Sequence, residues 1–164
     1  MKPTALYLGR FQPFHLGHLW VIRNALQKYK VKIAIGSSEE NSAQNPFTKE
    51  ERLEMIRNTL KADGLTVEDI YFVPDIPNDD EYVAHVRRIC GDFDLTLGGE
   101  KDFTRDLFER AGVAVELEGR FEGITATEVR RRMGVGEDWE VLVPEGTRLV
   151  IEKVGGVERV RLLP

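Results

Sequence analysis

Short apolar runs alternate along most of the chain with segments whose apolar positions recur every three or four residues. Runs of four to six residues that stop at glycine or proline are typical of buried strands, and the longer periodic segments are typical of amphipathic helices. Helices are predicted between the strands, the first of them running through residue 29. The predicted strands are 4–8, 31–35, 69–73, 94–97 and 113–117.

The second predicted helix has a clear signal at its start. Thr48 is followed three residues later by Glu51, the spacing of a capping box, in which each side chain accepts a hydrogen bond from the other residue's backbone N–H. Beyond residue 123 the pattern becomes helical only. It predicts a helix over 125–133, a short piece near 137–142, and a helix that Pro144 begins and Gly155-Gly156 ends.

Strands that alternate with helices favour right-handed crossovers and a parallel sheet with helices on both faces. We therefore expect an α/β fold, a doubly wound Rossmann-like parallel sheet of about five strands with a helical C-terminal segment. A chain of 164 residues suits one domain, here 1–164, with an α/β core over 1–122 and the helical segment over 123–164. Ligands of such sheets bind beyond the carboxyl ends of the strands. The ends predicted to meet there are Leu8-Gly9-Arg10, Gly36-Ser37-Ser38 and Gly98-Gly99-Glu100.

Composition excludes several classes of protein. With 41% hydrophobic and 31% charged residues, the chain has no apolar run near the roughly 20 residues that cross a bilayer. No apolar signal core follows Met1, so we expect a cytoplasmic protein with no membrane partner. The net charge of -5 argues against nucleic acid as a partner. Cys90 lies within an apolar helical pattern and is interpreted as a small core residue without chemistry.

Two imidazoles one helical turn apart are the strongest candidates for chemistry. His15 and His18 stand at the predicted N-terminus of a helix that follows a strand, where backbone N–H groups and the helix dipole favour an anion. Gly17 permits close backbone approach, and Arg10 adds a positive charge. A metal pair is the alternative, but zinc-binding helices use i, i+4 spacing with a further ligand. We therefore predict phosphate binding and no metal site.

A second candidate segment, Gly123 to Met133, lies far downstream. Thr125 and Thr127 can cap the predicted helix or turn their hydroxyls toward phosphate, and Arg130 follows about one turn later. An arginine run on a helix is otherwise typical of a solvated face.

Together these segments resemble a known superfamily. Gly9-Arg10-Phe11-Gln12-Pro13-Phe14-His15-Leu16-Gly17-His18 and Ile124-Thr125-Ala126-Thr127-Glu128-Val129-Arg130 are similar to the His-x-Gly-His and Ile-Ser-x-Thr-x-x-Arg motifs of nucleotidyltransferases, with Thr125 in place of the usual serine. Within that superfamily the chain most resembles the archaeal nicotinamide-nucleotide adenylyltransferases, almost from end to end. Further matching segments are Asn45-Pro46-Phe47-Thr48, Leu142-Val143-Pro144-Glu145 and Gly156-Val157-Glu158-Arg159.

The resemblance implies adenylyl transfer from ATP, with Mg2+ bound to the triphosphate, to nicotinamide mononucleotide, giving NAD and pyrophosphate. It also implies a homo-oligomer. It assigns catalysis to His15, His18, Arg10 and Arg130, which would contact the ATP phosphates. The remaining residues that it assigns to ATP binding are Gly9, Phe11, Gly17, Ile124, Thr125 and Thr127.

The resemblance places the acceptor near Ser37, Arg52, Asp79 and Tyr82, with Arg52 on the mononucleotide phosphate. A surface arginine of the helix is the other interpretation of Arg52. The chain departs from the family here. Asp79 and Tyr82 stand where the relatives carry an asparagine and a tryptophan that stacks on nicotinamide, and Gly98-Gly99-Glu100 replaces Ser-Gly-Asn.

Three alternative functions follow. A nucleotidyltransferase of the same fold could act on phosphopantetheine, FMN or a polyol phosphate, with ATP or CTP. A class I aminoacyl-tRNA synthetase also carries His-x-Gly-His, but the chain lacks a Lys-Met-Ser-Lys-Ser loop and a basic surface for tRNA. A non-catalytic nucleotide-sensing module could retain the same pocket.

Overall fold

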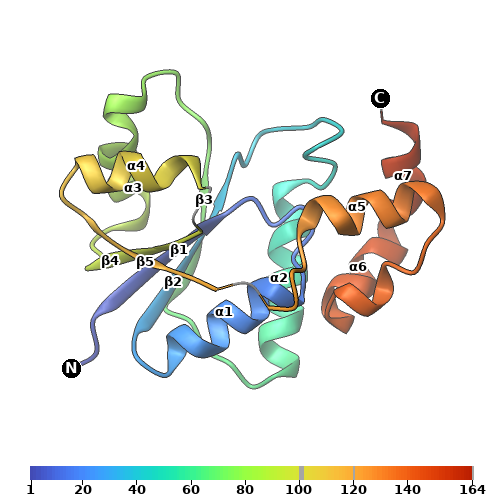
Figure 1. Cartoon of the computed structure of the whole chain (residues 1–164), viewed down its shortest axis with the longest axis horizontal. Coiled ribbons are helices and arrows are strands. Elements are labelled where there is room, and N and C mark those ends of the chain that lie inside the picture. Colours follow the sequence, from blue (N-terminus) through green and yellow to red (C-terminus); the bar gives the residue numbers. More distant parts are fainter. Residues whose placement is uncertain (100–101, 120, 164) are drawn as a thin grey trace. The chain divides into compact units, whose positions relative to one another are not determined.

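The computed structural model describes residues 1–99, 102–119 and 121–163 and alternates strands with helices along most of the chain (Figure 1). The strands are β1 (Thr4–Gly9), β2 (Lys30–Gly36), β3 (Asp69–Val73), β4 (Leu95–Gly98) and β5 (Ala114–Leu117). The helices are α1 (Leu16–Leu26), α2 (Lys49–Ala62), α3 (Tyr82–Cys90), α4 (Phe103–Arg110), α5 (Ala126–Val135), α6 (Glu145–Val154) and α7 (Gly156–Leu162). Two short 3-10 helices are η1 (Asp79–Glu81) and η2 (Glu140–Leu142).

The five strands form one parallel sheet in the order β3-β2-β1-β4-β5. The α/β, doubly wound prediction is therefore confirmed, and the order of strands reverses between β1 and β4. Gly9, Gly36 and Gly98 end three adjacent parallel strands, so these ends share one edge of the sheet, where such folds bind ligands. Glu100, which the sequence analysis placed beside them, lies outside the described residues.

The chain divides into two compact units. Unit one holds the sheet and consists of Met1–Gly9, Val21–Ser38 and Val67–Gly119. Unit two consists of Arg10–Trp20, Glu39–Thr66 and Arg120–Pro164. A single domain over 1–164 stays a prediction.

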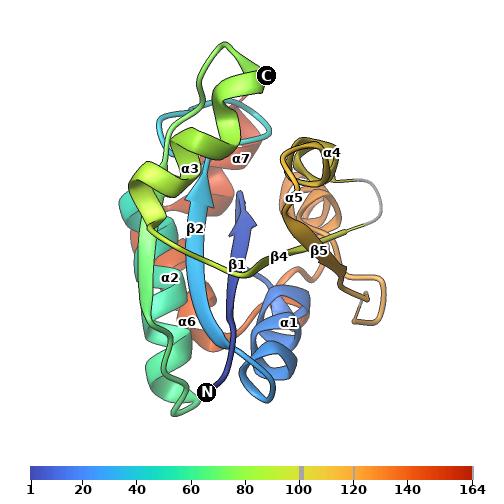
Figure 2. The same ribbon diagram turned by 90° about the vertical axis from the view of Figure 1, so that its left-hand side faces the viewer.

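Helices α3 and α4 of unit one pack on the sheet around one apolar core (Figure 2). Strand residues Leu6, Ala34 and Val73 meet Val86 and Phe108 of the two helices there. Cys90 belongs to this core, as predicted. Burial raises the pKa of its thiol to about 11, so the reactive thiolate is disfavoured.

Most sequence-predicted elements are confirmed, with one correction at a helix end and one helix that was not predicted. The first helix stops at Leu26 rather than 29, and Tyr29 then donates its N–H to the carbonyl oxygen of Ala25 at 2.8 Å. The helix begun by Pro144 ends at Gly155, in the left-handed conformation (φ 66°) that favours glycine at a C-cap. The chain then continues into α7, which the sequence analysis did not predict.

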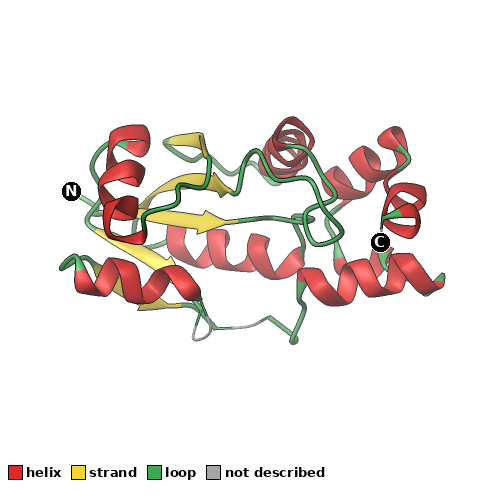
Figure 3. Ribbon diagram, turned by 90° about the horizontal axis from the view of Figure 1, so that it is seen from above, coloured by secondary structure: helices red, strands yellow, loops and turns green. Residues whose placement is uncertain are grey.

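Unit two combines α2 with the helices of the C-terminal segment (Figure 3). The Thr48–Glu51 capping box is confirmed at the start of α2. Helix α6 lies close against α2, because a Cβ on Gly146 would fall 2.8 Å from the backbone nitrogen of Thr59. Arg159 of α7 pairs with both oxygens of Glu51, at 2.6 and 3.0 Å. Within the described residues, no helix has the length and apolar character needed to span a membrane.

Candidate active site

The predicted site residues fall into two sets, one in each unit. Unit two brings together three segments that are far apart in sequence: the loop after β1, the start of α2 and the start of α5. The predicted residues in unit two are Arg10, Phe11, His15, Gly17, His18, Arg52, Ile124, Thr125, Thr127 and Arg130. Those in unit one are Gly9, Ser37, Asp79 and Tyr82.

His15 and His18 cap the N-terminus of α1 for each other. The Nδ1 atom of His15 accepts hydrogen bonds from the backbone N–H groups of Gly17 (3.0 Å) and His18 (3.3 Å). In return, Nδ1 of His18 accepts from the N–H of His15 at 3.0 Å. The two rings stack with centroids 3.6 Å apart. This is a capping box in which imidazoles replace the usual hydroxyl and carboxylate.

The reciprocal caps fix the protonation state of both rings. Because each Nδ1 atom accepts a hydrogen bond, each ring carries its proton on Nε2 and is neutral. Burial lowers the pKa of His15 to about 4. Burial, and then the neighbouring His15, hold the pKa of His18 well below its usual range. At neutral pH the pair therefore consists of two neutral Nε2–H groups rather than two cations.

A stability measurement tests the cap of His15. Its pKa in the folded chain lies below the unfolded value of about 6.5, so the unfolded chain binds the proton first as pH falls. The stability from His15 is complete above pH 6.5 and is lost toward pH 4, by on the order of 3 kcal/mol. Asparagine caps helices well but does not titrate. We expect His15→Asn to lose less stability than the wild type between pH 7 and pH 4.5 in urea unfolding; equal losses would contradict the buried neutral cap.

Gly17 is required by the first turn of α1 because of space rather than backbone conformation. A Cβ at this position would lie 2.9 Å from Cε1 of His15 and 3.5 Å from the carbonyl oxygen of Ile124. The loop that precedes α5 therefore lies directly against this turn. Phe11 is fully buried with φ 54°, a strained conformation for an aromatic residue, and its ring packs edge-on against His18.

Two guanidinium groups stand close together in unit two. Arg130 Nη1 donates to the carbonyl oxygen of Gln12 at 2.8 Å, and Nη2 lies 3.5 Å from the hydroxyl of Thr127. The pKa of Arg130 is lowered by burial and by the positive charge of Arg10. The exposed side chain of Arg10 has no carboxylate partner among residues 1–99, 102–119 and 121–163. Two cations that repel each other beside two helix N-termini would be stabilised by a polyanion.

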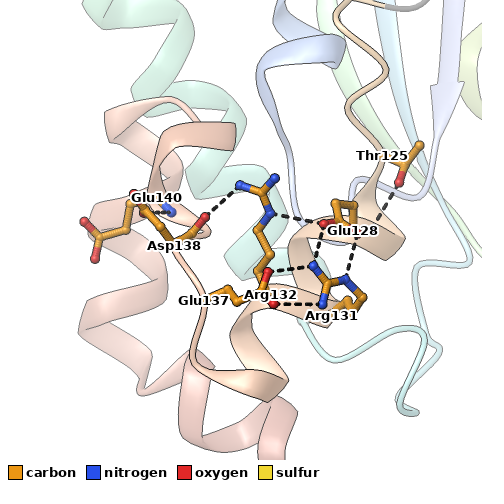
Figure 4. Close-up of polar contacts among 7 residues, drawn as sticks. All are labelled: Thr125, Glu128, Arg131, Arg132, Glu137, Asp138 and Glu140. Carbon is orange, nitrogen blue, oxygen red and sulfur yellow. Dashed lines mark hydrogen bonds and ion pairs between the residues drawn. The ribbon is translucent and has the colours of Figure 1, made fainter.

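The threonines and arginines near the start of α5 have different hydrogen-bond and ion-pair partners. The Thr125 hydroxyl caps the helix by accepting from the N–H of Glu128 at 3.1 Å. Arg131 and Arg132 both bind Glu128, and Arg131 also reaches Glu137, so these two arginines form a solvated ion-pair network (Figure 4). The solvated-face interpretation thus fits two arginines of the run, and Arg130 is the exception.

Arg52 is fully buried, so the interpretation as a surface helix arginine is wrong. Its Nε donates to the carbonyl oxygen of Thr48 at 3.2 Å and its Nη1 to that of Arg10 at 2.9 Å. Burial lowers its pKa to about 10, so the group remains a cation at neutral pH. A cation kept in the interior in this way requires compensation from dipoles and anions.

The residues predicted for the acceptor in unit one lie in different settings. Ser37 follows β2 with φ 46° and donates its hydroxyl to Asp75 Oδ1 at 3.1 Å. Asp79 is exposed at the start of η1. The Tyr82 ring is packed in the core, edge-on to Phe108, and is only 9% exposed, which leaves little of it for stacking on a ligand. Their role in acceptor binding stays a prediction.

Sequence reasoning missed Gln12 and its partner Phe47. The buried Gln12 amide donates to the carbonyl oxygen of Phe47 at 3.0 Å, and its Oε1 accepts from the N–H of Phe47 at 2.9 Å. A glutamine directly between Phe11 and Pro13-Phe14 is the signal that could have found it. Buried amides are expected to be paired.

In the part of the chain that the structure describes, no three His, Cys, Asp or Glu side chains lie close enough together to hold a metal ion. The charges of the site come instead from guanidiniums and helix N-termini. Guanidiniums at helix N-termini, in a chain that also forms a doubly wound parallel sheet, are typical of the class of α/β proteins that handle nucleotide phosphates.

Sequence comparisons identify the family within this class. The cytidylyltransferase-like family model matches residues 6–132. The nicotinamide-nucleotide adenylyltransferase of Methanolobus tindarius is 37% identical over 163 residues, which cover 96% of this chain and 92% of the relative. That of Archaeoglobus fulgidus is 39% identical, covering 96% and 95%. The chain therefore belongs to the cytidylyltransferase-like family and, within it, to the group of archaeal nicotinamide-nucleotide adenylyltransferases.

Solved structures support the fold. A bifunctional NMN adenylyltransferase/ADP ribose pyrophosphatase from Francisella tularensis matches with a TM-score of 0.76 and 25% identity. The match covers 99% of this chain and 52% of that protein, so this chain spans about half of its length. A second structure of that enzyme, at 24% identity and a TM-score of 0.74, was solved with AMP and a manganese ion.

Proposed function

We propose that the chain transfers the adenylyl group of ATP to nicotinamide mononucleotide, giving NAD and pyrophosphate. The observation that carries the proposal is the convergence, within unit two, of the neutral His15–His18 pair with Arg10 and Arg130 at the starts of α1 and α5. The similarity to the archaeal adenylyltransferases supports the choice of substrates.

In the proposed reaction, an oxygen of the mononucleotide phosphate attacks the α-phosphorus of ATP, and the bond from that phosphorus to the α,β-bridging oxygen breaks. Pyrophosphate leaves with the electron pair. The attacking oxygen is already ionised near neutral pH, so no general base is needed. Catalysis then depends on positioning and on stabilising negative charge.

The residues of unit two have separate tasks in this reaction. His15 and His18 donate from Nε2 to phosphate oxygens, and because they are neutral they do so without a change of protonation. Arg10 and Arg130 balance the charge that develops on the departing pyrophosphate. The remaining proposed contacts to ATP are Gly9, Phe11, Gly17, Ile124, Thr125 and Thr127.

Arg52 is proposed to bind the phosphate of the acceptor, because a buried guanidinium is stabilised by an anion. Ser37, Asp79 and Tyr82 are proposed for the rest of the acceptor. Mg2+ is proposed to enter as part of the MgATP substrate, on the phosphate oxygens, since Mg2+ is usually held in part by substrate phosphates.

The direct test is incubation of the protein with MgATP and, separately, nicotinamide mononucleotide, phosphopantetheine, FMN and a polyol phosphate, followed by mass identification of the products. NAD from the first acceptor alone supports the proposal. A product from another acceptor, or transfer from CTP in place of ATP, would reassign the substrate. Nucleotide binding without pyrophosphate release from any pair would indicate a sensing module.

Gly17→Ala tests whether the spacing of the two histidines matters for turnover. The added Cβ would displace the His15 ring from its cap, and misplacement of a catalytic group by about 1 Å costs up to about 100-fold in rate. We expect kcat to fall at least about tenfold. Gly134→Ala, in α5 with no atom within 4 Å of its added Cβ, is the matched control and should be fully active. Equal kcat in the two variants would refute the assignment.

We also propose that residues 1–164 act as one nucleotidyltransferase domain, located in the cytoplasm, as a homo-oligomer and without nucleic acid as a partner. The subunit number is measured by light scattering of the purified protein.

A further inference from the structure

The backbone of the loop after β1 orients two arginines that come from different helices. The carbonyl oxygen of Arg10 accepts from Arg52 of α2, and the carbonyl oxygen of Gln12 accepts from Arg130 of α5. Both guanidiniums are therefore aimed by carbonyl groups only two residues apart. A shift of this loop would move both cations together.

The loop does not hold this shape through its own conformation. Phe11, between the two carbonyl groups, has φ 54°, which an aromatic residue adopts only when its surroundings enforce it. The surroundings include the side chain of Gln12, whose amide forms two hydrogen bonds with the peptide groups of Phe47. This pairing resembles that of two neighbouring strands and fixes the loop against the segment before α2.

The segment that contains Phe47 is in turn held in place by α7, near the C-terminus of the chain. Arg159 of α7 donates to the carbonyl oxygen of Pro46 at 3.0 Å while it pairs with Glu51. Gly156 lies so close to Phe47 that a Cβ there would fall 2.9 Å from Cε1 of the ring. The Gln12 amide therefore connects the loop after β1 to a segment that α7 holds in place.

We propose that Gln12 is a positioning residue for the transfer reaction, which fixes the loop so that its carbonyl groups aim Arg52 and Arg130 at the phosphates. The inference rests on the proposed function. In this proposal Gln12 acts through the two arginines rather than on the substrate, because both polar atoms of its side chain are bonded to the backbone of Phe47.

The experiment compares Gln12→Leu and Gln12→Glu with the wild type, alone and combined with Arg130→Ala. Leucine removes both hydrogen bonds, and we expect kcat/KM to fall about 10- to 100-fold. In the Arg130→Ala background the same change should cost clearly less than in the wild type, because one of the two cations that Gln12 positions is absent. Gln27→Leu, at an exposed glutamine, should be as active as the wild type.

Gln12→Glu supplies a readout that lost stability would not produce. A glutamate protonated at this buried position can both donate and accept, as the amide does, whereas the ionised form can only accept. We expect its activity, relative to wild type at each pH, to rise as pH falls from 8 to 6. This variant also keeps the proposal testable if Gln12→Leu does not fold.

Three results would overturn the proposal: full activity of Gln12→Leu, an undiminished loss in the Arg130→Ala background, or a flat relative pH profile for Gln12→Glu. MgATP affinity, measured by calorimetry on the same samples, distinguishes a failure of the proposed function from a failure of the positioning role. Wild type that binds MgATP but makes no NAD contradicts the proposed function. Wild type that makes NAD while the Gln12 variants match it contradicts only the positioning role.

Discussion

Replacing His18 by alanine is expected to lower kcat by about 100-fold or more while the fold remains intact. The Nε2–H group of His18 would donate to charge that develops between the α- and β-phosphates, and loss of one such donor typically costs about 100- to 1000-fold. Steady-state kcat with MgATP and nicotinamide mononucleotide measures the effect, and circular dichroism checks the fold.

Two further variants separate the two functions of the His18 ring: the proposed donor at Nε2 and the helix cap at Nδ1. Asparagine can place an acceptor where Nδ1 receives the N–H of His15, but it has no group at the Nε2 position. Glutamine can reach the Nε2 position with an N–H donor. We expect His18→Asn to be as inactive as His18→Ala and His18→Gln to recover part of kcat. Near-normal kcat in His18→Ala would remove His18 from the mechanism.

Replacing Arg130 by alanine is expected to lower kcat/KM by about 100-fold or more. Arg130 is the arginine of its run that lies near Arg10 and is bound to the loop after β1. Its positive charge is proposed to act on the triphosphate, where charge-assisted bonds from a planar guanidinium are strong. Lysine lacks the fork that contacts both Gln12 and Thr127, so Arg130→Lys should recover only part of the activity.

The next residue provides the matched control. Arg131→Ala removes the same side chain from the same helix, but it breaks only exposed ion pairs with Glu128 and Glu137, which contribute little. We expect its kcat/KM to stay within about twofold of the wild type. If Arg130→Ala and Arg131→Ala were equally active, the convergence of α5 with the loop after β1 would have no catalytic meaning.

The fold was largely predictable because its signals are local. Each strand of the sheet is a short apolar run that ends in glycine or a turn, and the Thr48–Glu51 capping box is a four-residue signal. Helix α7 was missed because Gly155 and Gly156 together predict an end. Only Gly155 adopts the left-handed conformation, while Gly156 begins the next helix against Phe47.

The sequence predicted the residue types of the candidate site but not the surroundings of each side chain. The spacing of His15 and His18 indicated anion binding, yet the sequence could not give their protonation state, which depends on mutual capping and burial. Arg130, Arg131 and Arg132 are three consecutive residues of one type, so the sequence does not distinguish them. Their different roles follow from which carboxylates and carbonyl groups the fold places around each of them.

The sequence by itself determined the parallel α/β plan, the family and the presence of two motifs that resemble those of nucleotidyltransferases, because hydrophobic periodicity, caps and motif spacing are properties of neighbouring residues. Tertiary structure alone decided that Arg52 is buried, that Gln12 joins the loop after β1 to the start of α2, and that the two histidines are neutral. These properties arise between segments separated by tens of residues. Burial and hydrogen-bond partners at such distances exist only once the chain has folded.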